Sequence, residues 1–208
     1  MYDHSTTIGD FLNAAAAKQP APGGGSVAAL AGALAAAMGE MVLNYSVGKK
    51  NLAQFEPELK AALAEFTRAR GLLLQLMGED QVAYEALTAA KKLPLDAPGR
   101  QSDLDVALLA SIRVPQAMGA TALAVLQLAD QLVDKVNVYL LSDLAVACEL
   151  SMATLRCAAY NVRANLPDVT DAQDRRKIES TAQKLIDHAL PVIGRAIPAI
   201  WKRHGKGA

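Results

Sequence analysis

Apolar residues recur at helical spacing along almost the whole chain. Between residues 57 and 92 the apolar positions alternate in steps of four and three, which keeps them on one stripe of a helix. The stripe consists of Leu59, Leu63, Phe66, Arg70, Leu73, Met77, Asp80, Tyr84 and Leu87. No segment of useful length alternates apolar and polar residues as a half-buried strand does. The pattern therefore predicts a protein built of helices.

Capping residues and prolines divide the chain into six predicted helices with short connections. The first is a short helix, capped by Thr6 or Thr7, that resembles a lid. The second runs from about Ser26 to Gly48, the third from Pro57 to Lys92, and the fourth from about Ser102 to Lys135 with a kink at Pro115. The fifth is capped by Ser142 and Asp143 and ends near Leu166, and the sixth is capped by Thr170 or Asp171 and bends at Pro191 and Pro198. This order predicts an all-α, antiparallel bundle of about six long helices, in a single domain over residues 1–208.

The second predicted helix follows a proline and three glycines, Pro22 to Gly25. These residues prevent a helix from entering from upstream, so Ser26 is expected to cap the first turn. The glycines would let a ligand approach the free N–H groups at the positive end of the helix. Small and then polar residues follow on one face at four-residue spacing: Ala28, Gly32, Ala36, Glu40 and Asn44.

A glycine run before a helix is equally consistent with a tight corner and close helix packing. The sequence has no GxGxxG after a strand and no GK[ST] after the glycines. It therefore predicts no nucleotide site.

Asp80 is the main candidate for chemistry, because it lies on the apolar stripe of the third predicted helix. A carboxylate there is costly unless it is paired or used. Arg70 is nearly three turns away and is not expected to reach it. The open alternatives are an ion pair with a basic residue of a neighbouring helix and a functional carboxylate.

The composition argues against several classes of partner. The chain has 21 Lys and Arg residues and 21 Asp and Glu residues, so its charge balance indicates neither nucleic acid nor an anionic membrane. The apolar segment 27–47 is interrupted by Glu40 and Asn44, and no basic leader opens the chain. We expect a buried helix in a soluble protein rather than a membrane span.

Cysteine and histidine positions predict neither a disulfide nor a metal site. Cys148 and Cys157 are nine residues apart on one predicted helix and face opposite sides, so free thiols in a reducing cytoplasm are expected. His4, His188 and His204 have no metal-ligand spacing and are predicted to be surface residues. None is placed to serve a central nucleophile.

Several motifs in fixed order give the chain a resemblance to a known family. They are Pro22-Gly23-Gly24-Gly25-Ser26, Gly48-Lys49-Lys50, Asp80 with Ala83-Tyr84, Leu93-Pro94, Val114-Pro115, Asn137 with Ser142-Asp143, and the run Asn161 to Leu166. Over nearly its whole length the chain resembles the cyclodeaminase/cyclohydrolase family of folate enzymes. That family includes free-standing methenyltetrahydrofolate cyclohydrolases and the C-terminal half of formiminotransferase-cyclodeaminase.

The resemblance implies a cytoplasmic, homodimeric, all-helical enzyme of one-carbon metabolism with a tetrahydrofolate derivative as substrate and neither cofactor nor metal. It implies that Asp80 is the catalytic acid/base. The residues that match motif positions and are expected to bind substrate are Gly24, Gly25, Ser26, Lys49, Lys50, Asn137 and Asp143. The expected reaction is hydrolysis of 5,10-methenyltetrahydrofolate to 10-formyltetrahydrofolate.

Two alternatives stay open at this point. One is formiminotetrahydrofolate cyclodeaminase activity, which releases ammonia in the same pocket. The other is a non-catalytic helical dimer that binds folate or a protein partner. Val136 motivates the second alternative, because family members usually have glycine there. Bulky residues also follow Asn137, and the 93–114 connection is short, so the pocket could be reshaped.

Overall fold

The computed structural model describes residues 2–3 and 5–207, without the side chains of residues 206 and 207. His4 lies outside the described residues. This part of the chain contains α-helices, short 3-10 helices and no strand, which confirms the all-helical prediction. The α-helices are α1 (Ile8–Ala16), α2 (Gly24–Asn44), α3 (Glu56–Lys92), α4 (Arg100–Leu132), α5 (Leu141–Asn165) and α6 (Ala172–Gly207). The 3-10 helices are η1 (Lys50–Phe55), η2 (Val138–Leu140) and η3 (Leu166–Asp168).

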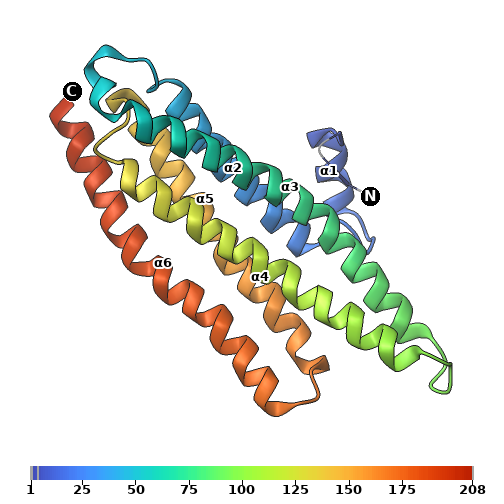
Figure 1. The fold of residues 1–208 in the computed structure, drawn as a ribbon. Coiled ribbons are helices and arrows are strands. Elements are labelled where there is room, and N and C mark those ends of the chain that lie inside the picture. The colour runs from blue at the N-terminus through green and yellow to red at the C-terminus, as the bar shows by residue number, and fades with distance from the viewer. Residues whose placement is uncertain (1, 4, 208) are drawn as a thin grey trace.

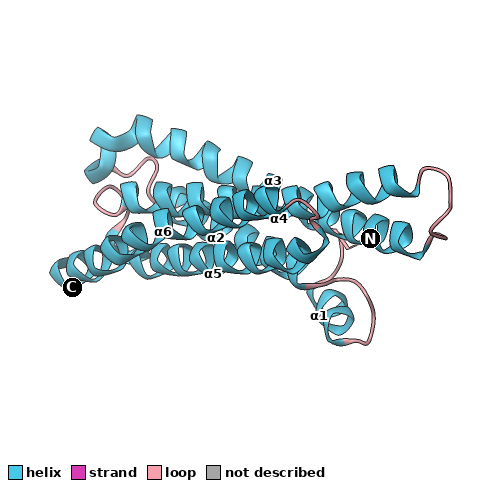
Figure 2. Ribbon diagram, turned by 90° about the horizontal axis from the view of Figure 1, so that it is seen from below, coloured by secondary structure: helices cyan, strands magenta, loops and turns pink. Residues whose placement is uncertain are grey.

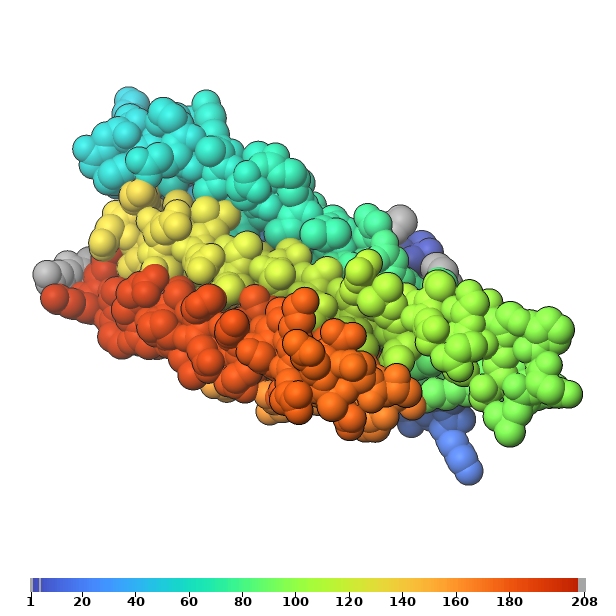
Figure 3. All heavy atoms as spheres, turned by 60° about the horizontal axis from the view of Figure 1, so that its bottom comes forward, coloured from blue at the N-terminus to red at the C-terminus, as the bar shows by residue number. Residues whose placement is uncertain are grey.

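Four of the helices form an antiparallel bundle. α2, α3, α4 and α5 each run opposite to the next, and α5 closes the ring against α2 (Figure 1). α6 packs along α4 and α5 on the outside of this ring. Figure 3 shows the orange-to-red surface of α6 beside the yellow-green surface of α4. The short α1 projects to one side of the bundle (Figure 2). α3 and α4 are longer than α2 and extend beyond its first residue as a helical hairpin (Figure 1).

The interior of the bundle is filled by aliphatic side chains with few aromatic ones. Its largest fully buried side chains include Leu43, Phe66, Leu126, Met152 and Ile200, from five different helices. Because these five helices contribute to one continuous core, α6 is part of the folded domain rather than an appendage.

Glycines on α2 allow α3 to approach very closely. A Cβ at Gly39 would lie 2.5 Å from the Phe66 ring. A Cβ at Gly32 would lie 3.1 Å from Leu73 and also 2.9 Å from Thr154 of the neighbouring α5. Successive glycines are seven residues apart, and so are the α3 residues that face them. The order of the facing residues is reversed, because the two helices run antiparallel. We call this series the glycine ladder; its third rung is Gly25.

The structure corrects some predicted helix starts. α2 begins at Gly24 with extended Gly23 as its N-cap, so Ser26 does not cap it. α5 begins at Leu141 without a side-chain cap, because the short η2 leads directly into it; Ser142 is therefore not a cap, although Asp143 lies in the first turn.

Other helix boundaries agree with the sequence. Thr7 caps α1, with its hydroxyl oxygen accepting from the N–H of Asp10 at 3.1 Å. Asp171 accepts from two N–H groups of the first turn of α6, each at 2.8 Å. α6 is assigned as one continuous helix that includes Pro191 and Pro198.

By length and composition alone, three helical segments within the described part of the chain are apolar enough to cross a membrane. They are Gly24–Asn44, Arg100–Leu132 and Val138–Asp168. Of their most apolar windows, 56%, 39% and 50% is buried inside the protein. Much of this apolar surface is therefore used in packing the bundle.

The glycine ladder gives a stability prediction. Gly39→Ala is expected to lower the free energy of unfolding by about 1–3 kcal/mol, because the new methyl group overlaps the Phe66 ring. Gly71→Ala on α3 is the control, since a Cβ there meets nothing within 4 Å. The control is expected to be neutral or to stabilise by about 0.5–1 kcal/mol. Urea denaturation measures both, and equal stabilities would contradict close packing at Gly39.

Candidate functional site

A cavity of about 230 Å³ lies where α2 begins and α5 ends, beside the continuing α3 and α4. All four helices of the bundle contribute to its walls. Glycines 23 to 25 and Pro20 line one side. Its polar side chains are Ser26, Asp80, Gln81, Tyr84, Ser111, Asn161 and Asn165.

Two larger cavities lie along the α3–α4 hairpin. One of about 800 Å³ is lined mainly by alanines and other apolar residues, and one of about 770 Å³ lies between α4 and the start of α6. Neither is lined by Asp80. We assign the candidate site to the smaller cavity, because a half-buried carboxylate and a glycine-rich helix N-terminus meet there.

Asp80 forms the third rung of the glycine ladder. A Cβ at Gly25 would overlap its carboxylate, so a glycine at this position leaves the room that the acid occupies. The Ser26 hydroxyl donates a hydrogen bond to Asp80 Oδ2 at 3.2 Å. The Ser26 side chain therefore binds the Asp80 carboxylate and does not cap α2, as the sequence had predicted it would.

Burial raises the pKa of the Asp80 carboxyl above its ordinary value. Hydrogen bonds from the hydroxyl and the backbone N–H of Ser26 act in the opposite direction but do not outweigh burial. The carboxyl is thus adjusted towards a proton-transfer role, since it holds its proton more tightly than an exposed aspartate does.

The ion-pair alternative for Asp80 is not realised in the described part of the chain. Arg70, the other charged residue of the α3 stripe, pairs with Glu40 on α2 through two guanidinium nitrogens. No basic side chain forms an ion pair with Asp80 there. The cavity therefore holds a carboxylate that lacks a cationic neighbour.

Asn161 and Asn165 also line the cavity, although neither was singled out from the sequence as a binding residue. Asn161 Nδ2 donates to the carbonyl of Cys157 at 2.9 Å. Asn165 Nδ2 donates to the carbonyls of Ser111 and Asn161 at 3.0 and 3.1 Å. Their spacing of four residues, which places them on one face of α5, was the available signal.

The N-terminal segment is fastened beside the site by Gln81, the residue after Asp80. The buried Gln81 amide accepts from the N–H of Tyr2 at 2.8 Å and donates to its carbonyl at 3.0 Å. The Tyr2 ring lies edge-on to Phe11 of α1, with 6.0 Å between the ring centroids. Phe11 is the buried anchor of α1, while Ile8 and Leu12 are exposed.

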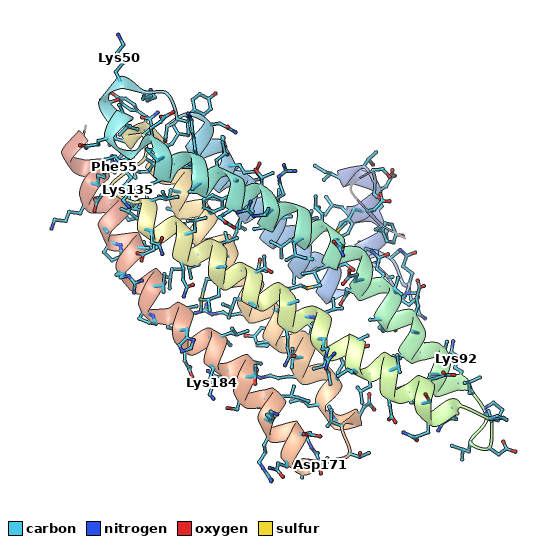
Figure 4. All side chains as sticks on the ribbon, viewed as in Figure 1. Lys50, Phe55, Lys92, Lys135, Asp171 and Lys184 are labelled. Carbon is cyan, nitrogen blue, oxygen red and sulfur yellow. The ribbon has the colours of Figure 1, made fainter. Side chains whose placement is uncertain are left out.

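The structure unites only part of the predicted site. Gly24, Gly25 and Ser26 line the cavity with Asp80. The predicted substrate-binding residues Lys49, Lys50, Asn137 and Asp143 do not line it. They follow the far end of α2 or begin α5, and the 21 residues of α2 span about 30 Å. Figure 4 shows Lys50 at the tip of the α2–α3 connection, remote from Lys92 at the other end of α3.

Asn137 has a structural role in this chain. Its Nδ2 donates to the carbonyl of Tyr45 at 3.3 Å, and its N–H donates to the hydroxyl of buried Ser46 at 2.9 Å. These bonds join the end of α2 to the α4–α5 connection. Val136, where the resemblance led us to expect glycine, is fully buried in the same region and does not line the Asp80 cavity.

Among the described residues, no group of three or more His, Cys, Asp or Glu side chains could hold a metal ion. Both cysteines are free; Cys148 is buried and Cys157 is partly exposed. Burial raises the pKa of the Cys148 thiol to about 12.

The fold and the cavity define a helical-bundle protein whose site is an unpaired carboxylate at a helix N-terminus. The model of the formiminotransferase-cyclodeaminase family matches residues 7–184. The chain belongs to this family.

Relatives of two kinds are similar to the chain. It is 34% identical to a methenyltetrahydrofolate cyclohydrolase of Methylorubrum extorquens, over 82% of this chain and 86% of the relative. It is 32% identical to a formimidoyltransferase-cyclodeaminase of Sus scrofa, over 89% of this chain and 36% of the relative. The crystal structure of a formiminotetrahydrofolate cyclodeaminase from Thermotoga maritima matches with a TM-score of 0.87 and 26% identity, over 95% of this chain and 97% of that one.

The raised pKa of Asp80 predicts a pH-dependent cost to stability. The folded protein binds this proton more tightly than the unfolded chain does, so stability is lost as pH rises through the raised pKa. Asp80→Asn is therefore expected to increase the free energy of unfolding at neutral pH. The gain should vanish below the ordinary value of 3.8. Urea denaturation of the variant and the parent at neutral pH and below pH 3.8 tests this. A variant less stable than the parent at neutral pH would contradict it.

Proposed function

We propose that the chain hydrolyses 5,10-methenyltetrahydrofolate to 10-formyltetrahydrofolate, with Asp80 as the general acid and base. The observation that carries the proposal is the half-buried Asp80 carboxylate without a cationic partner. The methenyl substrate is a cationic amidinium, so its charge would complement this carboxylate. A relative that is 34% identical to this chain and matches it over 86% of its own length is named for the same reaction.

The proposed chemistry proceeds in two steps. Water gives a proton to Asp80 and forms a bond to the methenyl carbon, while the C=N π electrons move to nitrogen. The neutral adduct then collapses: protonated Asp80 delivers its proton to the departing pterin-side nitrogen, and the adduct hydroxyl loses its proton to solvent as the formyl C=O forms. One proton is released for each cation hydrolysed. One carboxylate can serve both steps because it alternates between base and acid.

The start of α2 can assist by stabilising negative charge. Its first turn presents backbone N–H groups at Gly24 and Gly25, next to the carboxylate. Glycines let a ligand come within hydrogen-bond distance of these groups, and the helix dipole favours oxygen anions there. The glycine run would thus bind the developing oxygen or a substrate carbonyl.

The second candidate function is release of ammonia from formiminotetrahydrofolate. It is favoured by the structural likeness to the Thermotoga maritima cyclodeaminase. An absorbance assay separates the two reactions: hydrolysis removes the methenyl chromophore, whereas cyclodeamination creates it. We propose the cyclohydrolase reaction first, because the cyclohydrolase relative has the higher sequence identity to this chain, 34% against 26% for the cyclodeaminase.

We further propose that the protein is a cytoplasmic homodimer that acts without a cofactor. Dimerisation is supported by exposed apolar side chains on the adjacent helices α2 and α5. Val27, Leu34, Val146 and Tyr160 are between 46% and 61% exposed. On each helix the two residues are a multiple of seven apart, so they share a face that a second copy could cover.

The dimer proposal predicts a mass near twice 21.9 kDa in sedimentation experiments. Leu34→Glu is expected to shift the protein towards the monomer, because it places a charge within the apolar face of α2. A parent chain that sediments as a monomer would refute the proposal.

The catalytic proposal predicts that Asp80→Asn keeps the fold and lowers kcat by a factor on the order of a hundred or more. The matched control is Glu79→Gln, which neutralises the neighbouring, exposed carboxylate of the same helix. Loss of the methenyl chromophore measures both variants, and circular dichroism checks the fold. Equal kcat in Asp80→Asn and the parent would eliminate Asp80 as the acid/base.

A further inference from the structure

We propose that Asn161 binds the reacting water: its carboxamide oxygen accepts a hydrogen bond from the same water molecule that gives a proton to Asp80. This inference rests on the proposed hydrolysis and assigns a second residue to it. It requires the Asn161 oxygen to be available, close to the carboxylate and without another donor to bind.

The orientation of the Asn161 amide is fixed by its nitrogen. Only Nδ2 can donate to a carbonyl, and it donates to that of Cys157 at 2.9 Å. Oδ1 therefore points away from this carbonyl. It is also the atom nearest to a Cβ built on Gly24, at 3.5 Å.

Asn161 Oδ1 accepts none of the hydrogen bonds found among the described side chains and backbone groups. The same residues leave no buried side-chain oxygen or nitrogen without a partner. The oxygen is therefore open to the cavity rather than orphaned in the core. It is an acceptor available for a ligand or a water molecule.

Two consecutive glycines bring Asn161 and Asp80 to the same turn of α2. Asn161 lies against Gly24, and the Asp80 carboxylate lies against Gly25. Both side chains line the same cavity of about 230 Å³. The start of α2 is thus flanked by two oxygen acceptors from opposite helices, α5 and α3.

The chemistry of the substrate selects water as the donor that fits this pair. Both nitrogens of the methenyl amidinium are fully substituted, so no N–H of the substrate lies next to the reacting carbon. A water molecule has two O–H groups. If Asp80 accepts one and Asn161 the other, a lone pair of the water oxygen is left to face the carbon.

Asn161 also fits the later steps without a proton transfer of its own. After addition, the adduct keeps one O–H group, which can remain hydrogen-bonded to Asn161 Oδ1. Asp80 meanwhile holds the other proton and delivers it to the leaving nitrogen. The proton balance of the proposed reaction is unchanged, because Asn161 only orients the oxygen.

The test replaces the acceptor while keeping the side-chain volume. Asn161→Leu is expected to lower kcat about tenfold or more and to leave KM within about threefold, since the water rather than the folate loses its partner. The control is Thr154→Val, which removes a similar bond on α5, from Thr154 Oγ1 to the carbonyl of Leu150 at 2.8 Å. The control is expected to keep both constants.

A second variant gives a readout that a purely structural role would not produce. Asp80 and Tyr84 are the titratable side chains that line the cavity. Asn161→Asp retains an acceptor but adds a negative charge, which should move the acidic limb of the kcat profile, set by Asp80, to higher pH.

The outcomes separate this inference from the function on which it rests. Unchanged kcat in Asn161→Leu, or a raised KM with unchanged kcat, overturns the role of Asn161 and leaves the hydrolysis in place. An unshifted acidic limb in Asn161→Asp does the same. A parent chain that does not hydrolyse methenyltetrahydrofolate overturns the proposed function and this inference with it.

Discussion

The structure depends on the close approach of α2 and α3 along the glycine ladder. Gly39, Gly32 and Gly25 face Phe66, Leu73 and Asp80 in turn, at steps of seven residues on both helices. Because the first two rungs are tightly packed core contacts, the position of the third is set by the same helix crossing. The fold thus holds Asp80 against the start of α2 without needing a flexible loop.

Much of this could be predicted from the sequence, and the reasons for the failures are physical. The apolar stripe of α3 identified Asp80 as a carboxylate in a core position, and Pro22 to Gly25 identified the helix start that it meets. The four-residue spacing of Asn161 and Asn165 was visible in the sequence, but their place beside the cavity depends on α5 ending where α2 begins, which is a tertiary feature. The motif matches for Lys49 and Lys50 did not show which residues share a cavity; both residues follow the far end of α2 and do not line this one.

The environment of Asp80 explains why a single carboxylate could perform both proposed proton transfers. Burial favours its protonated form, whereas Ser26 hydrogen bonds favour the charged form. Burial is the larger effect, so the pKa is raised and the carboxyl takes up a proton more readily than an exposed aspartate does. An ion pair with a guanidinium would have favoured the charged form, but no basic side chain of the described residues pairs with Asp80.

Comparison of the three rungs of the glycine ladder indicates that Asp80 is not the residue that best packs against Gly25. At the two equivalent rungs, Phe66 and Leu73 fill the space opposite glycine and are fully buried. An apolar side chain at position 80 would extend this series without the desolvation cost that raises the carboxyl pKa. The acid therefore opposes stability at a position where the fold alone would favour an apolar residue. That conflict between local role and global fold is typical of functional sites, because stability is given up there in exchange for chemistry.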